Sequence, residues 1–337
     1  MKIAIYGAGS LGTVLGAFLA KGGMEADLVT RNAAHVAALR SAGARVIGTA
    51  DLTVPVRAFL PEEMADGYDL IFLLTKQLDN DGTVRFLASR LAEDGVVCTM
   101  QNGLPEPAIA RIVGEERTCG CAVAWGATLV GPGVCELTSE AESLTFSLGS
   151  LTDRSADKLP EIKRVLETMG PVAIEANFIG ARWVKLLVNC AFSGMSAVLG
   201  CTYGEVAADV AARRCAQRII KECIDVAAAA GIEIEPIQGK DVVKLLDYTG
   251  PIKRWISFAI IPLAIRKHRL LKASMLQDLE KGRKCEIDSI NGIVCEYGDR
   301  LGLPTPFNDR VREIVHGIEA GTYAPRRENV GLFRTLA

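Results

Sequence analysis

The stretch KIAIYGAGSLG, Lys2 to Gly12, decides the fold of the N-terminal part of this chain. Its apolar run predicts a buried strand, and its glycines open a helix that we expect over 10–22. In such a loop the first glycine permits a tight turn, the second lets the backbone approach a pyrophosphate, and the third allows the helix to pack closely on the strand. Free N–H groups at the positive end of the helix would bind the phosphates. We therefore predict a dinucleotide site, and the alternative is a glycine-rich turn without a ligand; the residues of the predicted site are Gly7, Ala8, Gly9, Ser10, Leu11 and Gly12.

Alternating β-type and helical segments continue through the first 175 residues. Such alternation predicts an α/β domain with a doubly wound, mainly parallel sheet of the Rossmann type and some antiparallel additions. We expect strands at 2–7, 26–30, 44–48, 52–56, 68–75, 95–100, 119–130, 134–139, 144–149 and 171–176, and helices at 10–22, 32–42, 79–91 and 155–169.

The second part of the chain has a different pattern, because long runs rich in Ala, Leu and Ile replace the short apolar ones. No strand is expected there. We predict two domains, 1–175 for the dinucleotide and 176–337 as an all-helical substrate and catalytic domain. The expected helices are 178–200, 204–230, 239–248, 254–280, 286–302 and 308–320.

Three polar residues follow strands of the predicted sheet. Arg31 comes about 20 residues after the glycine loop, where an NAD site would carry an acidic residue for the ribose hydroxyl. A guanidinium binds a 2′-phosphate well, so Arg31 favours NADPH over NADH, although a surface arginine is the simpler alternative. Lys76 and Asn102 also follow strands, and we expect them near the nicotinamide half of the cofactor.

The helical stretch RWVKLLVNCAFS, Arg182 to Ser193, places a lysine among apolar residues. Lys185, Asn189 and Ser193 recur every four residues and therefore share one helix face. Taken alone, this helix favours a lysine that extends its ammonium to water along apolar surface. The alternative is a cation held with two polar groups for catalysis.

A second polar cluster occupies KASMLQDLEKGRKCEIDSING, 272–292. Ser274 and Asp278 are four residues apart and can share a helix face, and Gly282 indicates a helix break. Glu286 begins the next helix. An acidic residue there either stabilises the helix N-terminus or binds a ligand, and the pattern alone leaves both open.

Taken together, these motifs resemble the ketopantoate reductase family over nearly the whole chain. The matching segments are GAGSLG (7–12), Arg31, Lys76, QNG (101–103), WVKLLVNC (183–190) and the 274–292 motif. The resemblance implies a Rossmann domain, a helical domain and an active site between them. By position, Lys185 is similar to the family's catalytic lysine and Glu286 to its substrate-binding glutamate. Asn102 and Asn189 match asparagines that position lysine, substrate or nicotinamide. Ser274 matches a substrate-binding serine, and Asp278 matches a recurrent aspartate of the motif for which we expect a mainly structural role.

The implied reaction is the NADPH-dependent reduction of 2-dehydropantoate (ketopantoate) to D-pantoate, in pantothenate and coenzyme A biosynthesis, with catalytic residues Lys185, Asn102 and Glu286. The chain departs from the family where Ser193 and Leu271 replace asparagines, and in a longer 236–273 segment. Ser193 remains a predicted substrate contact. These differences leave open another branched or aromatic 2-oxo acid, reduced to a D-2-hydroxy acid. A regulatory protein that binds NADPH without turnover is the alternative outside enzymes.

Composition limits the remaining function classes. The net charge of −2 gives no global attraction to nucleic acid or anionic lipid. The ten cysteines are scattered without a CxxC pair, and only three histidines accompany them, so we expect reduced thiols, no metal site and a cytoplasmic protein. The apolar run WISFAIIPLAI, 255–265, is too short to span a bilayer. It is a candidate contact surface for a homodimer, and a buried helix explains its apolarity equally well.

Overall fold

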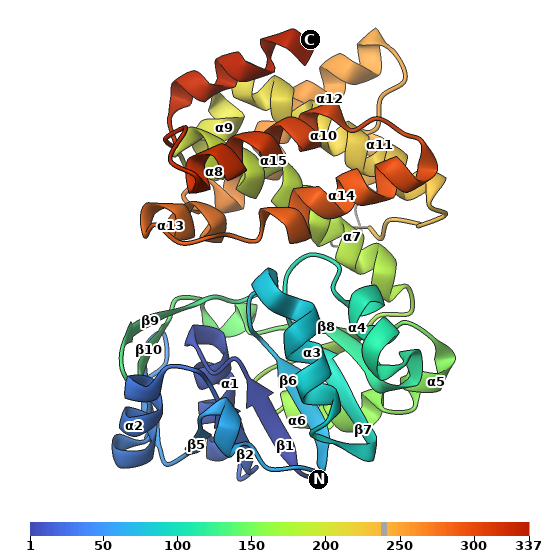
Figure 1. Cartoon of the computed structure of the whole chain (residues 1–337). Coiled ribbons are helices and arrows are strands. Elements are labelled where there is room, and N and C mark those ends of the chain that lie inside the picture. Colours follow the sequence, from blue (N-terminus) through green and yellow to red (C-terminus); the bar gives the residue numbers. More distant parts are fainter. Residues whose placement is uncertain (237–240, 337) are drawn as a thin grey trace. The chain divides into compact units, whose positions relative to one another are not determined.

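The computed structural model describes residues 1–236 and 241–336 and divides into two compact units (Figure 1). The first contains 1–101 and 105–178, and the second contains 102–104 and 179–337. The division after Phe178 lies close to the predicted boundary at 175/176. The grouping of 102–104 with the second unit has no counterpart in that prediction.

An eight-stranded sheet forms the centre of the first unit, with strand order β12-β11-β8-β7-β6-β1-β2-β5. All neighbouring strands are parallel except β8 and β11. From β5 to β8 the chain order is 3-2-1-4-5-6, the order of dinucleotide-binding sheets. The predicted α/β fold is confirmed. The strands are β1 (Ile3–Tyr6), β2 (Ala26–Val29), β5 (Arg57–Phe59), β6 (Tyr68–Leu73), β7 (Leu91–Thr99), β8 (Thr118–Val123), β11 (Phe146–Ser150) and β12 (Val172–Ile174).

Helices connect these strands and bury their apolar faces against the sheet. In α1, for example, Leu15 and Leu19 are fully buried in one core with Ile5 of β1. The predicted helix over 155–169 is in fact two, because Pro160 lies in the first turn of α6, where its fixed φ and missing N–H are tolerated. Helix α4 and the short strand β5 were not predicted. The helices are α1 (Ser10–Lys21), α2 (Ala33–Ala42), α3 (Asn80–Ala88), α4 (Glu106–Val113), α5 (Asp153–Ala156) and α6 (Leu159–Leu166).

A smaller sheet of order β4-β3-β10-β9 accompanies the large one. The β3–β4 and β9–β10 pairs are antiparallel, and β3–β10 is parallel. The predicted strand over 119–130 thus divides between the two sheets, at β8 and β9. The strands of the small sheet are β3 (Ala44–Gly48), β4 (Leu52–Val54), β9 (Ala127–Gly131) and β10 (Val134–Leu137).

Every regular element among the described residues of the second unit is a helix, and these helices surround one core that includes Trp183 and Ile219. One long helix predicted over 254–280 is wrong, because separate segments α12, η6 and α13 occupy this range. The prediction of 239–248 lies partly outside the described residues. The elements are α7 (Phe178–Val188), η5 (Asn189–Ser193), α8 (Gly194–Leu199), α9 (Tyr203–Ala208), α10 (Val210–Ala229), α11 (Val242–Leu246), α12 (Pro251–Ala264), η6 (Arg266–His268), α13 (Ser274–Glu280), α14 (Ile287–Leu301), α15 (Pro306–Glu319) and η7 (Arg327–Leu336).

Two general features of the sequence have structural counterparts. All ten cysteines are buried, and they are thiols that form no disulfide. Among the described residues, no helix is both long and apolar enough to cross a membrane.

Candidate functional site

The carboxyl ends of β1, β2, β6 and β7 lie at one edge of the large sheet, because these four strands are neighbours and parallel. This edge carries the glycine loop after β1, Arg31 after β2, and Lys76 after β6. Ligands of open α/β sheets bind at such an edge, where the strand order reverses direction. Here that reversal lies between β1 and β6.

The glycine loop is shaped by close backbone contacts. Gly7 has φ +102°, and a Cβ there would lie 2.5 Å from the Thr75 backbone nitrogen. A Cβ at Gly12 would lie 2.6 Å from the Gly7 carbonyl oxygen, so neither glycine can carry a side chain without movement. Over Gly9 the nearest such contact is at 4.0 Å, which leaves open space beside the loop.

That space lies at the N-terminus of α1, whose N-cap Gly9 supplies no side-chain hydrogen bond. The first N–H groups of an α-helix lack intrahelical acceptors and point outward with the positive end of the helix dipole. The loop from Gly7 to Gly12 therefore fits the pyrophosphate of a dinucleotide.

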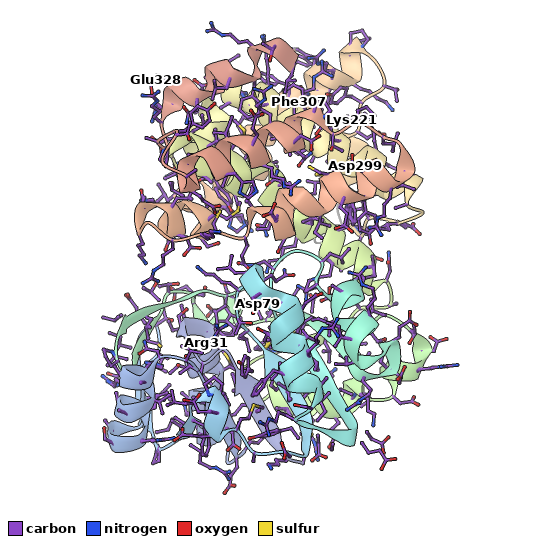
Figure 2. The ribbon with its side chains drawn as sticks, viewed as in Figure 1. Arg31, Asp79, Lys221, Asp299, Phe307 and Glu328 are labelled. Carbon is purple, nitrogen blue, oxygen red and sulfur yellow. The ribbon has the colours of Figure 1, made fainter. Side chains whose placement is uncertain are left out.

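Arg31 is exposed two residues beyond β2, and Asp79 lies at the same edge of this unit (Figure 2). Both charges act on the Tyr6 hydroxyl: burial raises the pKa of Tyr6, Arg31 counteracts this, and Asp79 adds to it. Asp79 also caps α3 by accepting a hydrogen bond from the Gly82 N–H at 3.3 Å. The exposed guanidinium of Arg31 thus lies at the edge that also carries the glycine loop.

Gln101 is a site-forming residue that sequence reasoning overlooked. Its buried carboxamide donates to the Thr75 carbonyl at 2.8 Å and to Asn80 Oδ1 at 2.8 Å, and accepts from Thr99 Oγ1 at 3.0 Å. These bonds join the loop that carries Lys76 to the segment that precedes Asn102. Because a buried amide needs partners, a glutamine directly after a buried strand was the available signal.

The next residues, 102–104, group with the helical unit. Leu104 is 4% exposed and belongs to that unit's hydrophobic core, and Gly103 turns the chain with φ +75°. The half-buried Asn102 is therefore held between the Gln101 hydrogen bonds and the Leu104 packing.

Lys185 lies in the last turn of α7 and is partly buried. Trp183 fixes this helix: it is fully buried, donates from Nε1 to the Cys223 carbonyl at 3.0 Å, and packs edge-to-face on Tyr297 at 5.4 Å. The core-facing side of α7 is therefore rigid. Lys185, two residues later, lies on a different face of the helix.

A π-helical turn, η5, follows α7 directly and was not predicted. In it the Gly194 N–H donates to the Asn189 carbonyl, an i to i+5 bond that inserts one residue into the helix. Such turns occur frequently at functional sites. The two ends of this turn, Asn189 and Ser193, are polar candidates predicted from the sequence.

Within the turn, the Ser193 hydroxyl lies 3.3 Å from Asn189 Oδ1 and 2.5 Å from the Tyr203 hydroxyl. Ser193 and Tyr203 are both buried, and burial raises the pKa of Tyr203 while the bond to Ser193 counteracts it. Ser193 thus stays a predicted substrate contact whose hydroxyl is already engaged. Its direct effect in the structure is to orient the Asn189 carboxamide.

The π-turn is held from outside by Asn291, a fully buried residue of α14. Its Nδ2 donates to the Cys190 carbonyl at 3.2 Å and to Asn308 Oδ1 at 2.9 Å. Asn308 Nδ2 in turn donates to Glu222 Oε2 at 2.7 Å. Burial raises the pKa of Glu222 to about 7, although the N–H groups that donate to its carboxylate lower this pKa. This relay connects η5 to α14, α15 and α10.

Glu286 occupies the N-cap position of α14, and its side chain makes no capping hydrogen bond. Its place at the N-terminus of α14 is compatible with both alternatives, helix stabilisation and ligand binding. Ser274 is the exposed first residue of α13, and Asp278 is buried one turn later. Both α13 and α14 pack against η5, so the structure brings the elements carrying Ser274, Glu286 and Asn189 together.

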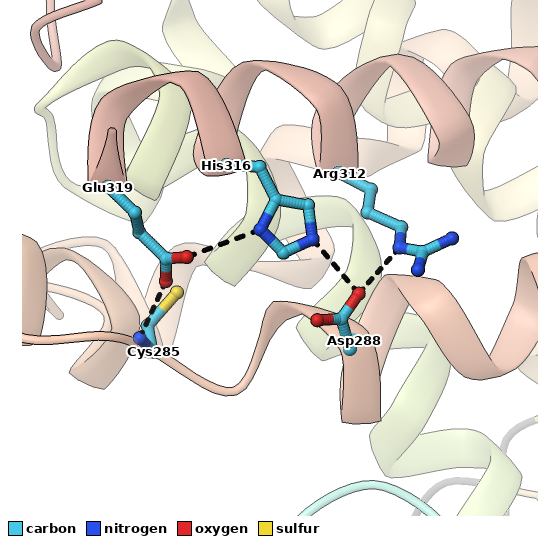
Figure 3. A network of polar contacts seen from close by, with 5 residues as sticks. All are labelled: Cys285, Asp288, Arg312, His316 and Glu319. Atoms are coloured by element: carbon cyan, nitrogen blue, oxygen red, sulfur yellow. Dashed lines mark hydrogen bonds and ion pairs between the residues drawn. The ribbon is translucent and has the colours of Figure 1, made fainter. Parts of the chain in front are cut away.

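The residues flanking Glu286 are anchored to α15 on both sides (Figure 3). The Cys285 N–H donates to Glu319 at 2.8 Å, and Asp288 Oδ1 accepts from Arg312 at 2.5 Å and contacts His316 Nε2 at 3.0 Å. Burial opposes ionisation of Asp288, but these hydrogen bonds outweigh it and hold the pKa of Asp288 below its usual value. Two anchors therefore fix the backbone at Glu286.

The apolar side chain of Leu271 offers no hydrogen-bonding group. Its side chain is 43% exposed, and only its backbone is engaged, accepting from the Tyr203 N–H at 3.1 Å. Across the described ranges, no group of three or more His, Cys, Asp or Glu side chains is arranged to hold a metal ion.

Comparisons with known proteins match both units. The family model described as "Ketopantoate reductase PanE/ApbA" matches residues 3–150, and "Ketopantoate reductase PanE/ApbA C terminal" matches 177–319. A 2-dehydropantoate 2-reductase of Mesorhizobium japonicum is 29% identical over 349 residues, covering 96% of this chain and 100% of the relative. One of Pyrococcus horikoshii is 28% identical over 310 residues, covering 91% and 94%.

Solved structures show the same fold. A ternary structure of D-mandelate dehydrogenase with NADH and anilino(oxo)acetate superimposes with TM-score 0.81 at 26% identity, covering 95% of this chain and 99% of that one. A PanE/ApbA family ketopantoate reductase from Ralstonia eutropha gives 0.79 at 26% identity, with the same coverage. Because family models match most of both units, the chain belongs to the ketopantoate reductase family.

Proposed function

We propose that this protein reduces 2-dehydropantoate to D-pantoate with NADPH. The observation that carries the proposal is the match to 2-dehydropantoate 2-reductases along 96% of the chain. The residues proposed below to carry the reaction are those on which the chain resembles the family, and the contacts around η5 and Glu286 support their placement.

Lys185 is the proposed general acid. When bound, the reduced nicotinamide supplies a hydride to the ketone carbon of the substrate. Negative charge then develops on the ketone oxygen, and the Lys185 ammonium stabilises this oxygen and donates a proton to it. General acid catalysis of this kind contributes about 10²–10⁴-fold. Asn189, one helical turn later, and Asn102 hold the lysine and the substrate by hydrogen bonds.

Glu286 and Ser274 are the proposed substrate-binding residues. A carboxylate at Glu286 accepts a hydrogen bond from the hydroxyl of 2-dehydropantoate, and Ser274 donates to its carboxylate. A substrate without that hydroxyl leaves Glu286 without this partner, at a cost of about 1–3 kcal/mol. Glu286 therefore selects hydroxylated 2-oxo acids.

NADPH would be held by the loop from Gly7 to Gly12 through its pyrophosphate and by Arg31 through its 2′-phosphate. Lys76 and Asn102, each following a strand at the ligand edge, would contact the nicotinamide half. The open space over Gly9 and the exposed guanidinium support this assignment.

Replacing Arg31 tests the cofactor. We expect Arg31→Ala to raise the KM for NADPH at least tenfold and to leave the KM for NADH nearly unchanged, because only NADPH carries the phosphate that the guanidinium binds. Steady-state kinetics with both cofactors measure this. An equal effect on both would mean that Arg31 does not read the 2′-phosphate.

A second candidate substrate class is another branched or aromatic 2-oxo acid, and two observations favour it. Ser193 is engaged with Tyr203, and Leu271 offers no polar side chain. The structural similarity to D-mandelate dehydrogenase points in the same direction, since that enzyme was solved with NADH and anilino(oxo)acetate.

A substrate panel separates the candidates. We expect kcat/KM for 2-dehydropantoate to exceed that for 2-oxoisovalerate and for benzoylformate at least tenfold with NADPH, because only the first presents a hydroxyl to Glu286. Cofactor oxidation at 340 nm measures all three. A preference for benzoylformate would replace the proposed substrate with an aromatic one, and no turnover with any would favour a binding protein.

A further inference from the structure

His35 is a buried histidine that none of the proposed reaction steps uses. It lies in the first turn of α2, four residues after Arg31, and is 1% exposed. Nδ1 of its imidazole lies 2.9 Å from the backbone nitrogen of Gly133, and Nε2 lies 2.9 Å from Thr13 Oγ1. Gly133 belongs to the turn between β9 and β10 of the small sheet, and Thr13 to the first turn of α1. The imidazole therefore joins the small sheet to the helix that begins at the glycine loop.

These two contacts fix the protonation of the imidazole. A backbone N–H can only donate, so Nδ1 accepts from Gly133 and carries no proton. Burial lowers the pKa of His35 and therefore favours this neutral form. The proton is then on Nε2, which donates to Thr13, and the Thr13 hydroxyl donates in turn to the Ala8 carbonyl at 3.4 Å. One directed chain of hydrogen bonds therefore runs from the small sheet through His35 and Thr13 into the glycine loop.

A second contact from the small sheet reaches the same loop. Cys135 of β10 is fully buried, and its thiol donates to the Gly9 carbonyl at 3.9 Å. That carbonyl also accepts from the Thr13 N–H at 3.0 Å, the bond that closes the first turn of α1. The strands of the small sheet pack against α1 (Figure 1), and the Gly133 carbonyl accepts from the Arg45 N–H of β3 at 2.9 Å. The far end of the hydrogen-bond chain is therefore itself held in place.

We propose that His35 is a positioning residue for the cofactor, which holds the glycine loop through Thr13 in the geometry that binds a pyrophosphate. The inference rests on the proposed use of a reduced nicotinamide dinucleotide. In a trans peptide the C=O and the following N–H point in opposite directions. Holding the Gly9 carbonyl inward therefore turns the Ser10 N–H, the first of α1, outward to the phosphates. Because this N–H is oriented before the cofactor arrives, loss of the anchor weakens cofactor binding.

The alternative is a histidine that only stabilises the packing of α1 on the small sheet. Loss of such a residue lowers the fraction of folded protein but leaves the dissociation constant of the folded molecules for the cofactor unchanged. A positioning residue instead changes that dissociation constant. NADPH and NADH carry the same pyrophosphate, so the change must be equal for both cofactors, unlike the effect expected for Arg31→Ala.

Two substitutions at position 35 distinguish the two ring nitrogens. His35→Gln places a carboxamide near the position of Nε2, where it can still donate to Thr13, whereas the shorter side chain of His35→Asn reaches only the position of Nδ1. We expect His35→Asn to raise the dissociation constants of NADPH and NADH by the same factor, at least about tenfold, and His35→Gln to stay within about threefold of wild type. Fluorescence titration of each reduced cofactor with the full chain measures both constants.

Thr13→Val removes the hydroxyl from the chain of hydrogen bonds and nearly keeps the shape of the side chain. We expect it to weaken both cofactors as His35→Asn does, and the double variant to bind no more weakly than either single variant, because both interrupt the same chain. Tyr68→Phe is the matched control, since Tyr68 is also fully buried and donates to Asp27 at 2.7 Å where β6 begins, at the end of the strand away from the glycine loop. Tyr68→Phe should lower the free energy of unfolding in urea and leave both dissociation constants unchanged.

The outcomes separate this role from the proposed function. Unchanged dissociation constants in His35→Asn and Thr13→Val would overturn the role of His35 and leave the proposed function intact. An increase for NADPH alone would also overturn it, because the substitution would then act on Arg31 and not on the loop. Wild-type protein that binds neither cofactor would overturn the proposed function and this role together. Circular dichroism verifies the fold of each variant, and if His35→Asn does not fold, Thr13→Val carries the comparison.

Discussion

Lys185→Ala is expected to lower kcat at least 100-fold and to leave the dissociation constant of NADPH within about twofold of the wild-type value. The physical reason is that the proposed proton donor and its charge act only as the ketone oxygen becomes negative, so their loss raises the barrier without removing a cofactor contact. Steady-state kinetics measure kcat, and titration of NADPH fluorescence measures binding.

Two further variants make this test specific. Lys185→Arg keeps the cation but cannot give up its proton, so a partial recovery of kcat would separate charge stabilisation from proton transfer. Lys244→Ala, whose side chain is 85% exposed on α11, serves as the matched control and should leave kcat unchanged. Turnover near the wild-type level in Lys185→Ala would remove Lys185 from the proposed mechanism.

Asn291→Leu is expected to lower the free energy of unfolding by about 2–4 kcal/mol and kcat by at least tenfold. The substitution removes both Nδ2 hydrogen bonds and leaves the buried Cys190 carbonyl and Asn308 Oδ1 without these donors. Because the Cys190 carbonyl belongs to the π-turn, Asn189 would move away from its position near Lys185. Small displacements in an active site cost large factors in rate.

A matched variant separates this positioning effect from stability alone. Asn329 is also buried, and its Nδ2 donates to the Val198 carbonyl at 2.9 Å and to the Ala324 carbonyl at 2.8 Å. Asn329→Leu should therefore destabilise the protein by a similar amount in urea unfolding while kcat stays near wild type. Equal kcat losses in both variants would show that Asn291 contributes only to stability.

The sequence was sufficient for those features that short-range patterns specify. The glycine spacing after an apolar run predicts the first βαβ unit, because only glycine tolerates the close backbone contacts seen at Gly7 and Gly12. The helical unit was predicted from its long apolar periodicity. Two breaks inside predicted helices were not predicted. The break between α12 and α13 depends on tertiary contacts, and the break before α6 arises because a proline in its first turn begins a new helix.

What the sequence by itself determined is the fold class, the position of the glycine loop and the polar residues on which the proposal depends. Only the tertiary structure decided how these residues are held. Gln101 joins two loops, Asn291 clamps a π-turn that no local propensity specifies, and α15 anchors both sides of Glu286. The structure also decided that Trp255 and Leu263 of the run at 255–265 face outward, whereas Ile261 is buried. Periodicity reports that a helix has an apolar face, whereas the direction of that face depends on partners distant in sequence, here Gln217 and Ser257.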